Sequence, residues 1–234
     1  MTSWPEFSSP PRTAWRGRYR LPRLVAVSLL LCGGLCLAAM ASTLPSAATV
    51  ARFGPQAERL FVQWRDLLAT LAGRPEGEAL KRVNLFFNRR ILFAENSNIW
   101  NQADYWATPL ETFGKGAGDC KSYAIGKYVS LRLLGMAPEK LRLVYVKAEM
   151  GGPASGLFEA HMVLTYYPAP TAEPLVLDNL VDSILPASQR PDLTPVFSFN
   201  MENIRVGNVQ SENVNQLARW KQLLDKLKAE GFSF

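Results

Sequence analysis

The sequence predicts an α+β fold, with helices packed on an antiparallel sheet, because helical and strand patterns occupy different parts of the chain. Helical patterns have apolar residues at intervals of three and four, and they cover residues 55–72, 76–93, 120–135 and the C-terminal end. Strand patterns are short and rich in apolar residues, and they cover residues 141–147, 160–167, 175–180 and 195–205. Residues 180–193, which lie between the last two strands, are predicted to form an exposed connection.

The predicted helices are bounded by residues that start or stop a helix. Gly73 and Pro75 end the first helix, because glycine is costly within a helix and proline cannot continue one. Gly135 provides a C-terminal stop for the helix that begins near residue 120. The last helix can be capped by Asn213 or Asn215, whose side chains suit an N-cap.

Residues 94–118 lose the helical period but keep several aromatic side chains. A loop of this length inside a compact domain is usually functional or well packed, so we expect it to form one wall of a cleft. Trp106 in this segment has two interpretations. Its indole N–H is suited to donate to an oxyanion, together with the Cys120 amide, but the simpler interpretation, which we favour, is an aromatic ring that fills the core.

The stretch Gly116-Ala117-Gly118-Asp119-Cys120 predicts a glycine-rich loop that turns into a helix. Asp119 can accept hydrogen bonds from the free amides of the first turn, and the positive end of the helix dipole then favours a nucleophilic thiolate at Cys120. We expect the glycines to leave open space above the sulfur. Cys120 is the only cysteine after residue 41, which indicates a free thiol, although a buried structural cysteine is the simpler alternative.

His161 is the only histidine in the chain, and therefore the only imidazole available to Cys120 as a general base. It opens one predicted strand, and Asp178 ends the apolar run of the next. Because side chains alternate along a strand, each residue has a defined face, and the chain order Cys, His, Asp allows the three side chains to converge. Asp182 is the nearest alternative for the third role.

The formal net charge of +6 does not indicate a nucleic-acid partner. Residues 1–41 contain five arginines and one glutamate, which accounts for +4 of the total and leaves the rest near +2. Residues 24–41 are apolar, carry no charge and end in Ala-Met-Ala, as expected for a signal peptide or a membrane anchor. We therefore expect a basic arm and leader over residues 1–41, one domain over residues 42–234, and a periplasmic location.

Four blocks of sequence together resemble the bacterial transglutaminase-like cysteine proteinases, a family that includes the periplasmic LapG-type proteases. The blocks are residues 105–111, 116–120 with the following helix, 160–164 and 177–179. The resemblance extends over roughly residues 56–220 and implies a papain/transglutaminase-like cysteine proteinase fold. It also implies that Cys120 is the nucleophile, His161 the general base and acid, and Asp178 the residue that orients the histidine.

The resemblance further implies a substrate and a regulator. LapG-type proteases release large surface adhesins, so it implies an adhesin substrate, control of biofilm attachment, and an inner-membrane cyclic-di-GMP receptor of the LapD type. Protein-glutamine acyl transfer is an alternative activity, because an acyl-enzyme can react with an amine instead of water. A non-catalytic binding module that keeps the fold is a second alternative.

Calcium is implied at Asp119 by the resemblance alone. LapG-type proteases commonly carry an acidic residue on each side of the cysteine, and here Asp119 matches while Lys121 does not. Lysine removes an oxygen ligand and repels a hard divalent ion. The chemistry itself is expected to need no cofactor, and Lys121 argues against calcium dependence. If chelator nevertheless inhibits the enzyme, the ligands come from elsewhere in the chain, with Asp104 as a candidate.

Overall fold

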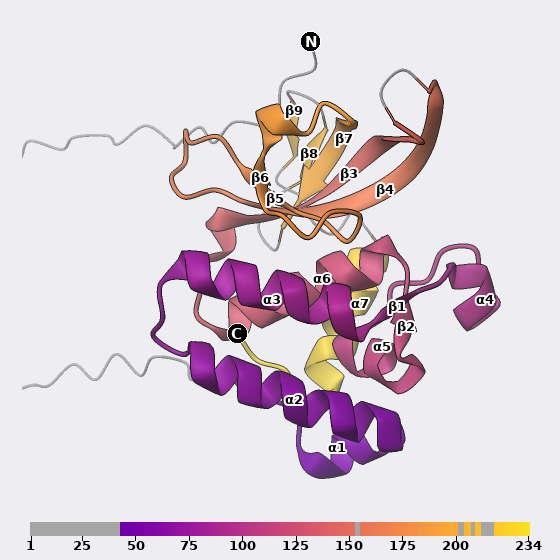
Figure 1. Ribbon diagram of the computed structural model, residues 1–234. Helices are drawn as coiled ribbons and strands as arrows, with labels where there is room; N and C mark the ends of the chain where they lie inside the picture. Colours follow the sequence, from indigo (N-terminus) through magenta and orange to yellow (C-terminus); the bar gives the residue numbers. More distant parts are fainter. Residues whose placement is uncertain (1–42, 153–154, 201–203, 207–208, 212–217) are drawn as a thin grey trace, which may run out of the picture.

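The computed structural model describes residues 43–152, 155–200 and 218–234, and the strands at 204–206 and 209–211. The chain forms two layers, with helices on one side and a sheet on the other (Figure 1). The predicted basic arm and leader over residues 1–41 lie outside the described residues, as do the predicted capping residues Asn213 and Asn215. Within the described part of the chain, no helix is both long enough and apolar enough to cross a membrane.

The helical layer contains three helices close to the predicted bounds and several shorter ones. The helices are α1 (Ala47–Ala51), α2 (Pro55–Leu71), α3 (Glu76–Arg90), α4 (Asn96–Trp100), α5 (Pro109–Lys115), α6 (Cys120–Leu133) and α7 (Ala218–Ala229), with 3-10 turns η1 (Pro138–Lys140) and η2 (Ala187–Gln189). Helix α3 ends before the predicted residue 93 because Ile91 is already extended. The chain then continues into a short strand.

Residues 94–118 are not the single loop that we expected, because they contain α4 and α5. Helix α5 begins with a capping box, in which Thr108 Oγ1 accepts from the Glu111 amide at 3.2 Å and Glu111 Oε2 accepts from the Thr108 amide at 2.7 Å. Pro109 occupies the first turn, where its missing N–H costs nothing. The sequence Thr108-Pro109-Leu110-Glu111 is therefore a capping-box signature that predicts the start of α5.

The main sheet is antiparallel throughout its described strands, as predicted. Its strands are β3 (Leu141–Met150), β4 (Leu157–Tyr166), β5 (Leu175–Leu177), β6 (Leu185–Pro186), β7 (Leu193–Phe199), β8 (Ile204–Val206) and β9 (Val209–Ser211). They lie in the order β6-β5-β4-β3-β7-β8-β9. Two further strands, β1 (Leu92–Phe93) and β2 (Ala117–Gly118), pair in parallel next to the start of α6.

Helix α6 is the central helix of the fold. It packs against α3 on one side and against β4 and β3 on the other (Figure 1). Residues Ser122 to Leu131 are all buried, so this helix is enclosed on every side. Because a residue at the start of such a helix is fixed by the whole core, α6 holds Cys120 in a defined position relative to the sheet.

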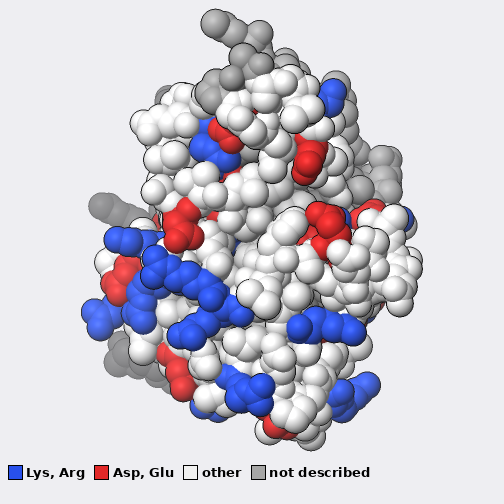
Figure 2. Space-filling model, turned by 45° about the vertical axis from the view of Figure 1, so that its right-hand side comes forward, with Lys and Arg blue, Asp and Glu red and all other residues white. Residues whose placement is uncertain are grey.

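The surface of the helical layer is strongly charged. Figure 2 shows Lys and Arg side chains gathered over the helical half of one face, with Asp and Glu side chains among and above them. One such pair joins α3 to the segment after β5, where Arg89 lies 3.5 Å from Asp182 and both side chains are at least half exposed. Exposed pairs of this kind contribute little to stability.

Candidate active site

Cys120 is the first residue of α6, as the sequence predicted. Asp119 caps the helix, because its Oδ1 accepts hydrogen bonds from the amide and the hydroxyl of Ser122, each at 3.0 Å. Among the described residues Cys120 is the one cysteine, and its thiol is free and half-buried. The Cys120 side chain is close enough to His161 to help raise the pKa of the imidazole, so the start of α6 and strand β4 meet at these two residues.

The glycines before Cys120 serve the packing of the turn. Gly116 has a φ of +63°, which ends α5 in a left-handed conformation that favours glycine. A Cβ on Gly118 would lie 2.5 Å from the Cβ of Ser122, so only glycine lets the strand pass this close to the helix. The space beside Gly118 is thus filled by Ser122, and the expectation that these glycines leave open space above the sulfur was wrong at this position.

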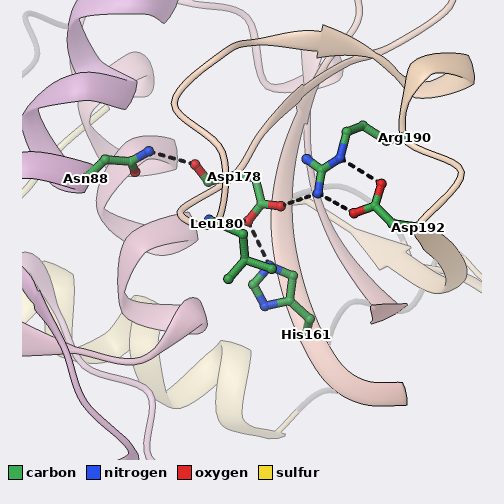
Figure 3. A network of polar contacts seen from close by, with 6 residues as sticks. All are labelled: Asn88, His161, Asp178, Leu180, Arg190 and Asp192. Atoms are coloured by element: carbon green, nitrogen blue, oxygen red, sulfur yellow. Dashed lines mark hydrogen bonds and ion pairs between the residues drawn. The ribbon is translucent and has the colours of Figure 1, made fainter. Parts of the chain in front are cut away.

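His161 lies on β4, and Asp178 directly follows the neighbouring strand β5. The register pairs Leu164 of β4 with Leu177 of β5, which makes Asp178 a diagonal neighbour of His161 on one face. The distance from His161 Nε2 to Asp178 Oδ1 is 2.7 Å, and both side chains are buried (Figure 3). Because Nε2 is engaged by the carboxylate, Nδ1 is the ring nitrogen that remains for Cys120.

The Asp178 carboxylate is held from several directions (Figure 3). Its Oδ1 also accepts a hydrogen bond from the Leu180 amide at 3.2 Å, and its Oδ2 accepts one from Arg190 at 2.7 Å. Asn88 of α3 donates to the backbone carbonyl of Asp178 at 2.8 Å. These contacts fix both the backbone and the carboxylate, so Asp178 can hold the imidazole in one orientation. Asp182, the alternative, accepts from Asn88 and pairs with Arg89 instead.

Arg190 is the residue that sequence analysis missed. Residues 180–193 were predicted to be an exposed connection, which is wrong for Arg190, because its side chain is only 3 % exposed. The guanidinium bridges two carboxylates, with Oδ2 of Asp178 at 2.7 Å and the two oxygens of Asp192 at 3.0 and 2.7 Å (Figure 3). A single arginine in a stretch without periodicity gives no signal in the sequence, so only the folded chain reveals this contact.

The network sets the charges of the site. Burial by itself would lower the pKa of His161, but hydrogen bonds to Asp178 and Cys120 outweigh it and raise the pKa to about 9. Burial by itself would raise the pKa of Asp178, but His161 and Arg190 hold it well below its usual range. At neutral pH the site therefore contains an ionised carboxylate beside an imidazole that retains its second proton.

Trp106 fills the core and is not aimed at an oxyanion. Its ring is 5 % exposed and packs against Phe199 and Trp220, with ring centroids 5.7 and 6.3 Å away. The indole N–H donates to Asp104 Oδ1 at 3.2 Å and is thereby already used. Of the two interpretations that the sequence allowed, the structure supports the aromatic core residue, so Trp106 is dropped as an oxyanion donor.

The carboxylates next to Cys120 do not fit a calcium site. Asp119 Oδ2 lies 2.5 Å from the Lys121 ammonium, while Oδ1 is used by the helix cap. Lys121 also lies 3.5 Å from Asp104, which pairs with Arg219 at 2.7 Å. Calcium prefers six to eight oxygen ligands, and here cations already neutralise both carboxylates. In the part of the chain that the structure describes, no three His, Cys, Asp or Glu side chains are grouped to hold a metal ion.

An apolar hollow of about 550 Å³ adjoins the site on the sheet. Its walls come from three strands, and the residues that bear on the site are Tyr145, Phe158 and Ala160. Ala160 directly precedes His161, and Tyr145 lies close enough to Cys120 to interact with it electrostatically. Phe158 is 57 % exposed, which is unusual for a phenylalanine and adds apolar surface to this hollow.

Comparison with known proteins identifies the family. The sequence matches the family model for "Bacterial transglutaminase-like cysteine proteinase BTLCP" over residues 68–192, which is more than half of the chain. The chain belongs to this family. This proteinase is also similar to solved structures of Legionella pneumophila LapG. No protein of curated function matches the sequence.

Three LapG structures give the extent of the similarity. The calcium-bound form has 34 % sequence identity and a TM-score of 0.67, and the match covers 77 % of this chain and 96 % of LapG. A second LapG structure has 33 % identity and a TM-score of 0.68, with 80 % and 99 % covered. The EGTA-treated form has 32 % identity and a TM-score of 0.68, with 80 % and 100 % covered.

These comparisons confirm the predicted fold and class of enzyme. The proteinase has the mixed helix and antiparallel-sheet fold of LapG, and it is a cysteine protease. One of the Legionella LapG structures is described as calcium-bound. In the present chain the donors around Asp119 do not fit that ion, because Lys121 lies among them.

Proposed function

We propose that this proteinase is an exported endopeptidase that uses Cys120, His161 and Asp178 as a catalytic triad. The observation that supports this most directly is the position of the His161 ring, whose Nε2 lies 2.7 Å from Asp178 Oδ1 and whose pKa is also raised by the nearby Cys120 side chain. A thiol, an imidazole and a carboxylate in this order are the groups that acyl transfer from a peptide requires.

The proposed reaction has two halves. The Cys120 thiolate attacks the peptide carbonyl carbon, and His161 gives its proton to the departing amine as the C–N bond breaks, which leaves a thioester on Cys120. The neutral imidazole then takes a proton from water, and the resulting hydroxide attacks the thioester carbonyl. The C–S bond breaks, the carboxylic acid product leaves, and the thiolate and imidazolium are restored.

Asp178 and Arg190 keep the imidazole ready for both halves. Asp178 accepts from Nε2, which directs Nδ1 towards Cys120, and it stabilises the imidazolium. Arg190 keeps the carboxylate ionised despite its burial. Since Trp106 is not available, we assign the oxyanion to backbone amides at the start of α6, which point outward at the positive end of the helix dipole.

The substrate in this proposal is the periplasmic region of a large surface adhesin, whose release controls biofilm attachment. The similarity to LapG and the resemblance of the sequence blocks to LapG-type proteases support it. The apolar hollow lined by Tyr145 and Ala160 suits a substrate that presents an apolar side chain near the cleaved bond. The proposal includes a periplasmic location, delivery by the leader at residues 1–41, and sequestration by an inner-membrane cyclic-di-GMP receptor of the LapD type.

Gene deletion in the native organism, followed by complementation, tests the proposal. We expect the deletion strain to retain a large surface protein that wild-type cells release in shortened form. Complementation with the wild-type gene should restore release, and complementation with Cys120→Ala should not. Identical surface proteins in all four strains would rule out the adhesin substrate, and an N-terminal sequence of the released fragment would locate the cleavage site.

An amine acceptor separates hydrolysis from acyl transfer. The purified exported part is incubated with the cell-surface protein that the deletion identifies, with and without a labelled primary amine. We expect two peptide fragments and no label in either condition. Label incorporated faster than fragments appear would instead assign the enzyme to protein-glutamine acyl transfer.

A further inference from the structure

Lys121, the residue after the nucleophile, lies between two carboxylates from different segments. Its ammonium is 2.5 Å from Asp119 Oδ2 and 3.5 Å from Asp104 Oδ1. The side chain is only 13 % exposed, unlike the surface lysine Lys221, which is 58 % exposed.

The two carboxylates anchor the parts of the chain that meet at Cys120. Asp119 caps α6 and so defines where the helix that carries Cys120 begins. Asp104 lies in the segment between α4 and α5 that leads to Trp106, and it also pairs with Arg219 of α7. Lys121 is the group that joins the first carboxylate to the second.

We propose that Lys121 is a positioning residue whose ammonium serves as a built-in cation, tying the Asp104 segment to the start of α6 in place of a divalent metal ion. Two neighbouring carboxylates without a cation would repel each other. A covalently attached ammonium neutralises them at any calcium concentration, and it occupies the oxygen atom of Asp119 that the helix cap leaves free. The proteinase is therefore calcium-independent at this position. The kinetic part of this inference rests on the proposed function, whereas the stability part does not.

Three variants test the positioning role. Lys121→Met removes the charge and keeps the length of the side chain, so kcat should fall roughly tenfold to a hundredfold while KM changes little, because only the alignment of Cys120 is disturbed. Lys121→Arg should recover most of the loss. Lys221→Met, which removes an exposed ion pair with Asp225, is the matched control and should leave kcat unchanged.

Calcium binding gives a second measurement that needs no substrate. The midpoint of thermal unfolding of the wild type should be the same in millimolar calcium and in chelator. Lys121→Glu places a third carboxylate beside Asp119 and Asp104, so its midpoint should be lower in chelator and should rise with calcium, since a ligand that binds only the folded state stabilises it. Lys121→Met should show no such rise.

Several results would overturn the inference. A wild-type unfolding midpoint that rises with calcium, or activity that chelator removes, would show that a metal ion binds despite Lys121. A Lys121→Met variant with wild-type kcat and unfolding midpoint would show that the ion pairs do not position the site. If no proteolysis is found at all, the proposed function fails, but the calcium dependence of the unfolding midpoints still decides the present question.

Discussion

The two halves of the active site are held in different ways. On the helix side, the contacts around Cys120 are mostly local, such as the Asp119 cap on Ser122 and the Asp119 pair with Lys121, and a longer contact joins Lys121 to Asp104. On the sheet side, His161 is placed by Asp178, which is seventeen residues away, and Asp178 by Arg190, twelve further on. The comparison teaches that the nucleophile is set by local helix geometry and the acid–base pair by a buried charge network.

This difference predicts how each half responds to substitution. Loss of the Cys120 thiol on the helix side should remove activity with little loss of stability, because no buried charge loses its partner there. Changes on the sheet side should lower both, since a buried charge that loses its partner destabilises the fold. The following experiments measure activity and unfolding together, beginning with the largest expected effect.

Cys120→Ala should lower kcat by roughly 10⁴-fold or more, because no other group can form the acyl-enzyme. The free energy of unfolding should change by less than about 1 kcal/mol, since the thiol is half-buried and small. Hydrolysis of a peptide substrate and urea unfolding measure the two effects. Retained hydrolysis would show that Cys120 is not the nucleophile. A large loss of stability would contradict the difference proposed between the helix side and the sheet side of the active site.

Asp178→Asn should lower kcat by roughly 10³-fold, which is less than the loss from His161→Ala, because the carboxylate orients the ring and does not itself transfer a proton. The variant should also unfold at lower urea, since Arg190 loses one of its two charge partners. Asp182→Asn is the matched control: its side chain is half exposed, and we expect a change of at most about twofold. Equal kcat for the two variants would move the third role away from Asp178.

Arg190→Leu should cost about 3 kcal/mol of unfolding free energy, because the Asp178 carboxylate would stay buried without its guanidinium. We expect a smaller loss in kcat, roughly tenfold, since the His161 contact with Asp178 remains. Arg190→Lys should recover part of the stability but not all, because a lysine cannot bridge both carboxylates in the same way. Chemical unfolding and steady-state kinetics on all three proteins check this, and unchanged stability in Arg190→Leu would contradict it.

The pH dependence of activity sharpens the comparison further. The pKa of His161 is raised from 6.5 to about 9 in the folded chain, so its contribution to stability is fully present below pH 6.5 and is lost as pH rises through about 9. Because the imidazolium protonates the leaving amine, kcat should also fall as the pH rises through about 9, which forms the upper limb of the pH–activity profile. In Asp178→Asn the limb should move to lower pH, since one of the contacts that raise the pKa is weakened. If the upper limb of the pH–activity profile is unchanged in Asp178→Asn, Asp178 does not set the pKa of His161.

Trp106→Phe should have the smallest effect. The substitution removes the indole N–H that donates to Asp104 and keeps an aromatic ring in the core. We expect kcat to fall less than tenfold, whereas loss of a true oxyanion donor costs roughly 10²- to 10³-fold. A loss of that larger size, measured with an unchanged unfolding midpoint, would restore Trp106 as an oxyanion donor.

The sequence by itself determined the parts of the fold that depend on local spacing. The periods of α2, α3 and α6, the Asp119 cap and the alternation of β4 were all predicted from residues within a few positions of one another. The capping box of α5 was equally local and was overlooked, although its signature is complete. The ordered sequence blocks likewise carried the resemblance to the family.

Only the tertiary structure decided what surrounds the catalytic groups. It placed Arg190 beneath Asp178, turned the Trp106 indole towards Asp104, and brought Asp104 within 3.5 Å of Lys121. These contacts join segments far apart in the chain. Strand register and helix packing decide which residues meet, and neither can be inferred from a short stretch of sequence. For that reason the sequence could nominate the nucleophile and its base, while the charges that hold and tune them became visible only in the folded chain.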